Sequence, residues 1–249
     1  MGEVKMRLLV FSLILAMAGF VPLCADASAI NGTVWTSTVY GSGTGQSSDL
    51  TNGGAVMGSL TSSNALATFT LGTINLYAGS GTPPTYQQFL SGSTSGGNPN
   101  NLQNQSSGKD IEVNGSEVNV WSAPLQTSSS IASIFQFTGE AYFSKNFSFT
   151  ADDGFDLYLN GVLQNSTNVV SSTPMSPTAR DFTITNAGVY SFTINYAAWN
   201  GTPEELELTA GTMTPVAEPS TLVFMGAGIL ALGLVLRRRL GDSAARAGS

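Results

Sequence analysis

The sequence predicts an all-β protein built as an antiparallel β-sandwich, and three observations lead to this class. Apolar and polar residues alternate on both sides of Asp152-Asp153, over 147–159, as in strands with one face against a core. Asn160-Gly161 follows at once, and such a pair favours a tight β-hairpin. The 249 residues include 28 Gly, 10% charged residues and no His, a composition that suits an extracellular protein of short strands and many turns.

Residues 1–29 are predicted to be a signal peptide. Basic residues precede an apolar run that ends at Phe20, and small residues up to Ala29 suit a signal peptidase. The single cysteine, Cys24, lies inside this segment. Cleavage near Ala29 would leave a mature chain without a thiol, which excludes disulfides and a cysteine nucleophile.

The predicted sandwich domain covers 30–212, and its first half is the less regular one. Short runs rich in β-formers predict strands at 34–40, 67–71 and 74–77. The stretch 85–90 fits either a short helical turn or a strand. Residues 91–108 are polar and rich in Asn and Gly, which predicts a long, solvated surface loop.

The second half has a stronger β pattern. Asn114-Gly115 predicts one hairpin, and the Asp-Asp-Gly turn a second. Further strands are expected at 131–138, 139–143, 182–184, 189–196 and 206–208, with 182–184 and 189–196 paired through a turn at 186–188. Shared parity along the strands predicts these core residues: Phe149, Phe155, Leu157, Leu159, Tyr190, Phe192 and Ile194.

Two stretches, ADDGFDLYLNG at 151–161 and GVYSFTINYAAWNGTPEELEL at 188–208, resemble the protective-antigen-type domain. This domain is a lectin-like β-sandwich that also occurs in flocculins and related glycan-binding adhesins. Its pattern is an aspartate pair before a strand that ends in a glycine hairpin, and then a strand with alternating aromatic residues. The resemblance covers at least 130–210 and implies the same sandwich.

In the glycan-binding members, the resemblance implies a Ca²⁺ ion held by the two aspartates, through a cis peptide, and by an Asn of a later loop. The matching residues are Asp152, Asp153 and Asn200. Carboxylate and amide oxygens are ligands that Ca²⁺ prefers. The alternative is a turn in which the Asp side chains only cap backbone groups. Trp199 could stack on a sugar ring or fill the interior, where a Trp buries a large area.

The C-terminal segment 213–240 resembles a PEP-CTERM sorting signal. The apolar run 222–236 has 15 residues, fewer than the roughly 20 of a spanning helix, and the arginines after it favour the cytoplasmic side, with 241–249 as a cytoplasmic tail. The residues that carry the resemblance are Val216, Glu218, Pro219 and Ser220 before the run, and Arg237, Arg238 and Arg239 after it. The resemblance implies an exosortase as processing partner, a transient inner-membrane precursor, and release or attachment at the outer surface of a Gram-negative bacterium. A plain single-pass anchor is the alternative.

The net charge and the absence of catalytic motifs limit the classes of function. Residues 30–218 hold three basic and thirteen acidic side chains, a net charge of −10, which argues against nucleic acid as a partner. The chain has no His and neither a Gly-x-Ser-x-Gly nor a Walker motif, and adjacent aspartates do not flank a glycosidic bond, so an enzyme is not expected. The prediction is a surface-sorted module that binds extracellular polysaccharide or surface glycan with the help of calcium. The alternative is a structural protein of the extracellular matrix or biofilm.

Overall fold

The computed structural model describes residues 29–38, 50–92, 97–128, 130–164, 177–199 and 201–216. The predicted signal peptide up to residue 28, Asn200, and the predicted sorting signal beyond Val216 lie outside these ranges. Within the ranges, no helix is long and apolar enough to cross a membrane.

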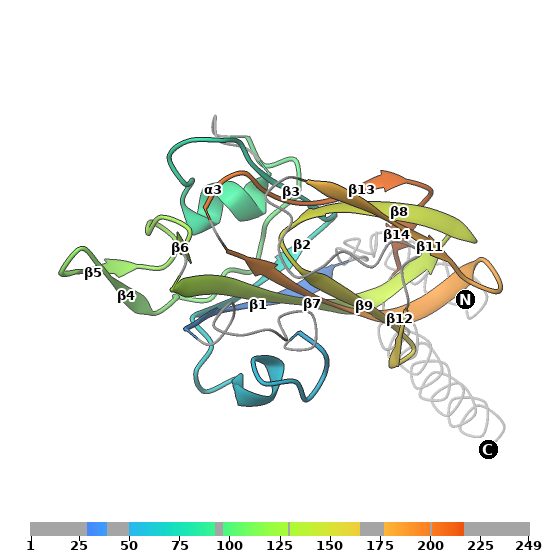
Figure 1. Ribbon diagram of the computed structural model, residues 1–249, viewed down its shortest axis with the longest axis horizontal. Helices are drawn as coiled ribbons and strands as arrows, with labels where there is room; N and C mark the ends of the chain where they lie inside the picture. Colours follow the sequence, from blue (N-terminus) through green and yellow to red (C-terminus); the bar gives the residue numbers. More distant parts are fainter. Residues whose placement is uncertain are drawn as a thin grey trace, which may run out of the picture.

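Two antiparallel sheets stack face to face, with β8 and β13 above β1, β7 and β12 in Figure 1. The larger sheet has the order β10-β9-β12-β7-β1-β2, and β6 and β14 also pair with β7. The smaller has the order β11-β8-β13-β3. The predicted all-β antiparallel sandwich is therefore confirmed.

The larger sheet consists of β1 (Ile30–Ser37), β2 (Ala67–Leu71), β6 (Thr127–Ser128), β7 (Ile131–Phe143), β9 (Phe155–Leu159), β10 (Val162–Leu163), β12 (Gly188–Ala198) and β14 (Met213–Pro215). The smaller consists of β3 (Asn75–Ala78), β8 (Asn146–Asp152), β11 (Thr178–Thr183) and β13 (Glu204–Ala210). A separate hairpin, β4 (Asp110–Val113) and β5 (Ser116–Asn119), projects from one end of the sandwich (Figure 1). The helical elements described are η1 (Met57–Ser59) and α3 (Tyr86–Ser91).

The core between the sheets is aromatic. The Phe135 ring stacks on Phe137 at 6.1 Å and on Tyr196 at 6.0 Å between centroids. Six of the seven predicted core residues are buried, but Tyr190 is only partly buried, because it lies near the start of β12 and its hydroxyl reaches out to the Asn186 carbonyl. A Cβ on Gly32 would come within 2.2 Å of the Phe69 ring, so β1 needs a glycine where that ring crosses it.

Several local predictions are confirmed. Asn114-Gly115 and Asn160-Gly161 have positive φ at both residues, as a two-residue hairpin turn of type I′ requires. The stretch after Thr85 is the helix α3, and Thr85 caps it in a reciprocal capping box with Gln88. The two strands expected at 131–138 and 139–143 are one continuous strand, β7.

Two predicted hairpins are wrong. β8 pairs with β11 and β13 in the smaller sheet, whereas β9 pairs with β10 and β12 in the larger, so the residues between β8 and β9 cross from one sheet to the other. β11 and β12 are divided between the sheets in the same way. The reason is that period-two alternation shows which face of a strand is buried, and the inner faces of both sheets have the same pattern.

The Asn-rich loop differs from the expected solvated loop at Asn100. This side chain is fully buried, and its Nδ2 donates to the carbonyls of Asn75 at 2.7 Å and Leu90 at 3.0 Å. Asn98 accepts from the Leu102 N–H and donates to its carbonyl. The amides therefore anchor the described part of the loop to β3 and α3.

Candidate functional site

The Asp pair lies at the crossover between the sheets. Asp152 is the last residue of β8, and Asp153 begins the connection to β9. The peptide bond between them is cis, as the resemblance implies. The two residues are 3% and 1% exposed, so the structure places both predicted carboxylates in one buried position.

The end of β12 holds this crossover in place. The Trp199 N–H donates to Asp153 Oδ2 at 2.5 Å, and the Ala197 N–H donates to the Gly154 carbonyl at 2.9 Å. The Tyr196 hydroxyl, itself fully buried, donates to the Asp152 carbonyl at 2.5 Å. These bonds fix the backbone on which the two carboxylates are carried.

Two glutamates that the sequence did not point to lie beside the Asp pair. Glu204 is fully buried, and its Oε2 lies 3.4 Å from the Tyr196 hydroxyl. Glu205 lies directly opposite Asp152 in the register of β13 and β8, and Tyr77 of β3 lies opposite Glu205 on its other side. The signal for Glu204 is its parity, because it shares a strand face with Leu206 and therefore points toward the core.

Burial raises the pKa values of this cluster. The pKa of Asp152 rises to about 6, mainly through burial and further through the charge of Glu205. The pKa of Glu204 rises to about 12, because it is buried beside the charges of Asp153 and Asp152 and hydrogen-bonds to Asp153. Burial and the charges of Asp153 and Asp152 therefore favour the neutral form of Glu204, in which its carboxyl group can donate a hydrogen bond to Asp153.

Some oxygens of the cluster lack a donor. Asp152 Oδ2 and Glu204 Oε1 are buried and accept no hydrogen bond from the part of the chain that the structure describes. A buried carboxylate oxygen is costly unless it binds a proton, a donor or a cation. The donor set consists of hard oxygens, which fits Ca²⁺ in kind.

The carboxylates alone do not make a complete metal centre. Among the described residues, no group of three or more His, Cys, Asp and Glu side chains is arranged to hold a metal ion. A Ca²⁺ ion at Asp152 and Asp153 would therefore need further oxygens from carbonyl groups, water or Asn200. Asn200 lies outside the described residues, so its role stays a prediction.

Trp199 is 8% exposed and packs in an apolar cluster with Trp35, Leu50 and Val56 on the outer face of the larger sheet. This position agrees with the alternative that its ring fills the interior. Stacking on a sugar would need a more open ring face than this cluster leaves. Trp199 contributes to the site through its backbone N–H, which donates a hydrogen bond to Asp153 Oδ2.

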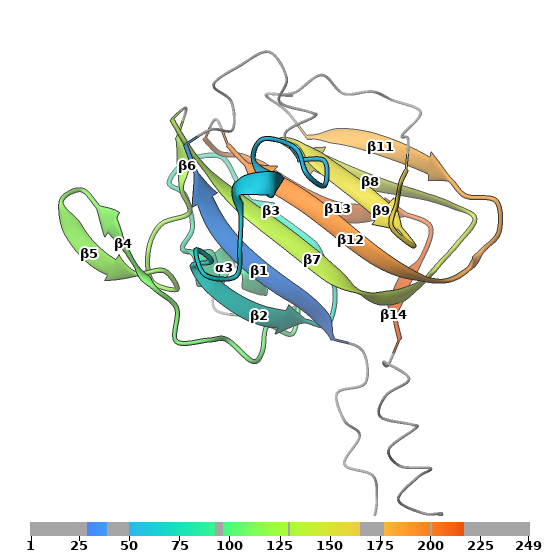
Figure 2. The ribbon, with the colours of Figure 1, turned by 90° about the horizontal axis from the view of Figure 1, so that it is seen from below.

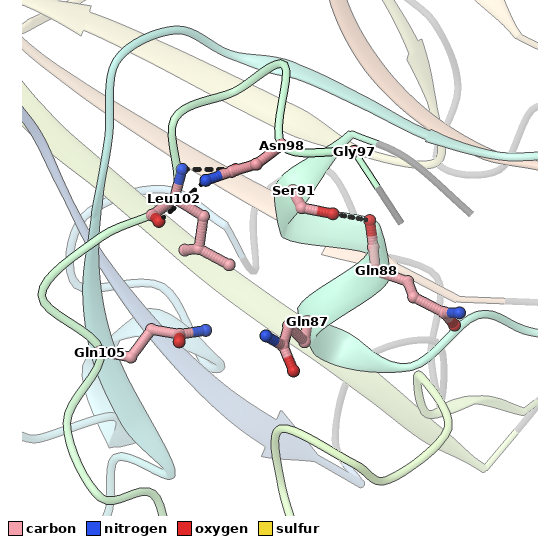
Figure 3. A pocket seen from close by; sticks show the side chains of 7 residues that line it. All are labelled: Gln87, Gln88, Ser91, Gly97, Asn98, Leu102 and Gln105. Carbon is pink, nitrogen blue, oxygen red and sulfur yellow. Dashed lines mark hydrogen bonds between the residues drawn. The ribbon is translucent and has the colours of Figure 1, made fainter. Parts of the chain in front are cut away.

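A separate cavity of about 250 Å³ lies beside α3 (Figure 3). Its lining residues are Gln87, Gln88, Ser91, Gly97, Asn98, Leu102 and Gln105. Most of its polar side chains hold the local structure: Gln88 Oε1 accepts from the Thr85 N–H, the Ser91 hydroxyl donates to the Gln88 carbonyl, and Asn98 is bonded to Leu102. The cavity is therefore the space between a capped helix and an anchored loop.

The fold and the cluster define an all-β sandwich with a buried acidic crossover. No protein-family model and no curated protein matches the chain. Among solved structures, the PA14 domain of the MpAFP antifreeze protein is similar at 16% identity and a TM-score of 0.43, over 76% of this chain and 86% of that one. The PA14 sugar-binding domain from an RTX adhesin is similar at 15% identity and a TM-score of 0.43, over 77% of this chain and 99% of that one.

Proposed function

We propose that this protein is a non-enzymatic, surface-sorted module that binds extracellular polysaccharide or surface glycan, with Ca²⁺ held at the crossover. The observation that supports this most directly is the pair of adjacent, buried carboxylates at Asp152 and Asp153, with Asp152 Oδ2 lacking a donor among the described residues. A fold that needed only a turn here would not require two buried acids, because burial of a charge is unfavourable.

In this proposal Asp152 and Asp153 hold the ion, and Asn200 adds an amide oxygen. Bound Ca²⁺ supplies coordination positions for the hydroxyl oxygens of a sugar. The chain's own part is to fix the two carboxylates: the Tyr196 hydroxyl binds the Asp152 carbonyl and the Trp199 N–H binds Asp153. The thirteen acidic residues of 30–218 favour cations and neutral glycans over anionic partners.

The sequence signals at the two ends complete the proposal. The signal peptide exports the chain, the apolar run 222–236 holds the precursor in the inner membrane, and an exosortase processes it near Glu218-Pro219. The mature protein would then act outside the cell or at its surface.

Thermal and chemical unfolding with calcium and with chelator tests the metal. If Ca²⁺ binds the native state, wild-type protein should gain about 2.7 kcal/mol when the ion is a hundredfold above its dissociation constant. Asp153→Asn should lose most of that gain, because it removes one charged ligand. Asp110→Asn, at an exposed position of β4, is the matched control and should keep it.

The alternative function, a structural matrix protein, makes the opposite prediction. Identical wild-type unfolding curves in both buffers would exclude calcium binding and would mean that the Asp pair only forms a structural turn. A glycan array with calcium and with chelator then separates binding from scaffolding. Binding that needs calcium supports the proposal, and the absence of any glycan binding supports the matrix role.

A further inference from the structure

A line of polar side chains crosses the outer face of the larger sheet. Gln136 of β7, Thr33 of β1 and Thr68 of β2 lie directly opposite one another in the registers of the two strand pairs. Their chain neighbours Phe135, Val34 and others point into the core, so these three point away from it. With neighbouring strands about 4.8 Å apart, three hydrogen-bonding groups span roughly 10 Å.

A segment from 50 to 65, which includes η1, lies against the same face. Figure 2 shows it in front of β1 and β7, and Figure 1 shows it below the larger sheet. It is attached by an apolar cluster in which Leu50 and Val56 pack with Trp35 and Ile134. It is also tied by the Trp35 Nε1–H, which donates to the Thr61 carbonyl at 2.9 Å. The segment therefore forms a wall beside the polar line.

A cavity of about 260 Å³ lies between this wall and the sheet, and we call it the neutral cleft. Gln136, Thr33, Thr68 and Trp35 line it on the sheet side, and Met57 and Leu60 are among the residues that line it from the wall. Its lining contains no charged side chain. The volume is below the range of about 300–1,000 Å³ typical of drug-sized ligands, so a small ligand fits.

Several polar groups of the neutral cleft are available for a ligand. Within the described ranges, the hydroxyls of Thr33, Thr68 and Ser62 have no side-chain hydrogen bond. Gln136 Nε2 donates to Asn195 Oδ1 at 3.0 Å, which orients the amide and leaves Oε1 as an acceptor. The cavity beside α3 differs in this respect, because most of its polar groups already hold the helix and the loop.

We propose that the neutral cleft binds one neutral sugar unit without calcium. Hydroxyls that both donate and accept, an amide acceptor, an apolar side and the absence of charge match a polyhydroxylated ring, which has polar edges and apolar C–H faces. A charged ligand would find no counter-charge in the lining. This site lies on the other sheet from the carboxylates of β8 and β13, so it does not depend on the calcium-binding proposal.

Solution NMR in the presence of chelator tests the proposal. Glucose, galactose, mannose and N-acetylglucosamine are titrated separately into the ¹⁵N-labelled protein, and the indole N–H of Trp35 is the local reporter because it is bonded to the cleft residue Thr61. At least one sugar should shift this signal in a saturable way. Thr33→Val and Thr68→Val each remove one hydroxyl at nearly constant size and should weaken binding roughly fivefold.

Thr138→Val is the matched control, because Thr138 lies on the same face of β7, two residues beyond Gln136, and does not line the cleft. It should bind like wild type. The proposal is overturned if no sugar shifts the Trp35 signal, or if both cleft variants bind as tightly as the control. Thermal unfolding checks that each variant folds, and Thr68→Val, at an exposed position, keeps the test valid should Thr33→Val destabilise the sheet.

Discussion

Both sheets of the sandwich carry a line of polar residues across their strands, but the two lines satisfy their polar groups differently. On the larger sheet, the neutral line consists of Asn195 and Gln136, which bond to each other, and Asn195 Nδ2 donates to the Leu50 carbonyl at 2.7 Å. On the smaller sheet, the acidic line runs from Asp152 through Glu205 to Tyr77. An amide both donates and accepts, whereas an ionised carboxylate only accepts. Amides can therefore complete one another, and carboxylates need a proton, a cation or an outside donor.

The difference explains why the acids around Asp152 have raised pKa values, whereas the amides around Asn195 hold a segment of the chain. Around Asp152, burial favours the protonated form of Glu204, and Asp152 Oδ2 accepts no hydrogen bond from the residues that the structure describes. Around Asn195 the side-chain bonds attach the segment after Leu50 to the sheet. The acids around Asp152 therefore need a proton, a cation or an outside donor, whereas the amides around Asn195 complete one another and hold the segment 50–65 on the sheet.

The largest stability effect is expected from breaking the neutral line at Asn195. Asn195→Ala removes the bonds to the Leu50 carbonyl and Asn52 and leaves Gln136 Nε2 without its acceptor, at a fully buried position. The free energy of unfolding should fall by about 3 kcal/mol. Urea denaturation measures it, and hydrogen exchange should show lost protection in the segment 50–65.

Thr193→Ala is the control, because Thr193 lies on the same face of β12 and is only partly buried. It should cost no more than about 1 kcal/mol. Equal losses for the two variants would show that the amide network does not hold the segment.

A smaller effect, of opposite sign, is expected at Asp156, a carboxylate of β9 that lies opposite Asn195 at the end of the neutral line. Burial raises its pKa to about 6, although Arg180 acts in the other direction. The folded state therefore binds this proton more tightly than the unfolded state, and the resulting stability is present below about pH 4 and lost as the pH rises through 6. Asp156→Asn should stabilise the protein by about 2 kcal/mol at pH 7 and hardly at all at pH 4.

Urea denaturation between pH 4 and pH 8, in chelator, checks this prediction. The variant should keep part of the wild-type slope, because the pKa of Asp152 is raised to about 6 as well. Asp110→Asn, on the exposed hairpin of β4 and β5, serves as the control and should follow the wild-type curve. A difference between Asp156→Asn and wild type that does not change with pH would contradict the assignment.

The sequence predicted the strands and turns, because these depend on residues that are close together in the chain. Alternation located β8, β9 and β12, and Asn-Gly pairs located two turns, because both signals act within a few residues. The sequence did not show that β8 and β9 belong to different sheets, since inner faces look alike. It also did not show that Glu204 lies beside Asp153 or that Gln136 lies opposite Thr33, because these positions depend on which strands pair.

The smallest stability effect is expected at Tyr77, the open end of the acidic line. Its ring is 51% exposed, so Tyr77→Ala should change the free energy of unfolding by less than about 1 kcal/mol. If a glycan binds at the Asp pair, however, the ring lies beside it, one strand beyond Glu205. An aromatic face packs well against the C–H groups of a sugar, so the variant should weaken calcium-dependent glycan binding roughly tenfold.

Tyr142→Ala, at a 40% exposed position of β7 in the other sheet, is the matched control. Glycan titrations by calorimetry compare the two variants. A loss confined to Tyr77→Ala would place the sugar over the acidic line, whereas wild-type affinity in Tyr77→Ala would mean that the glycan contacts the Asp pair from another side.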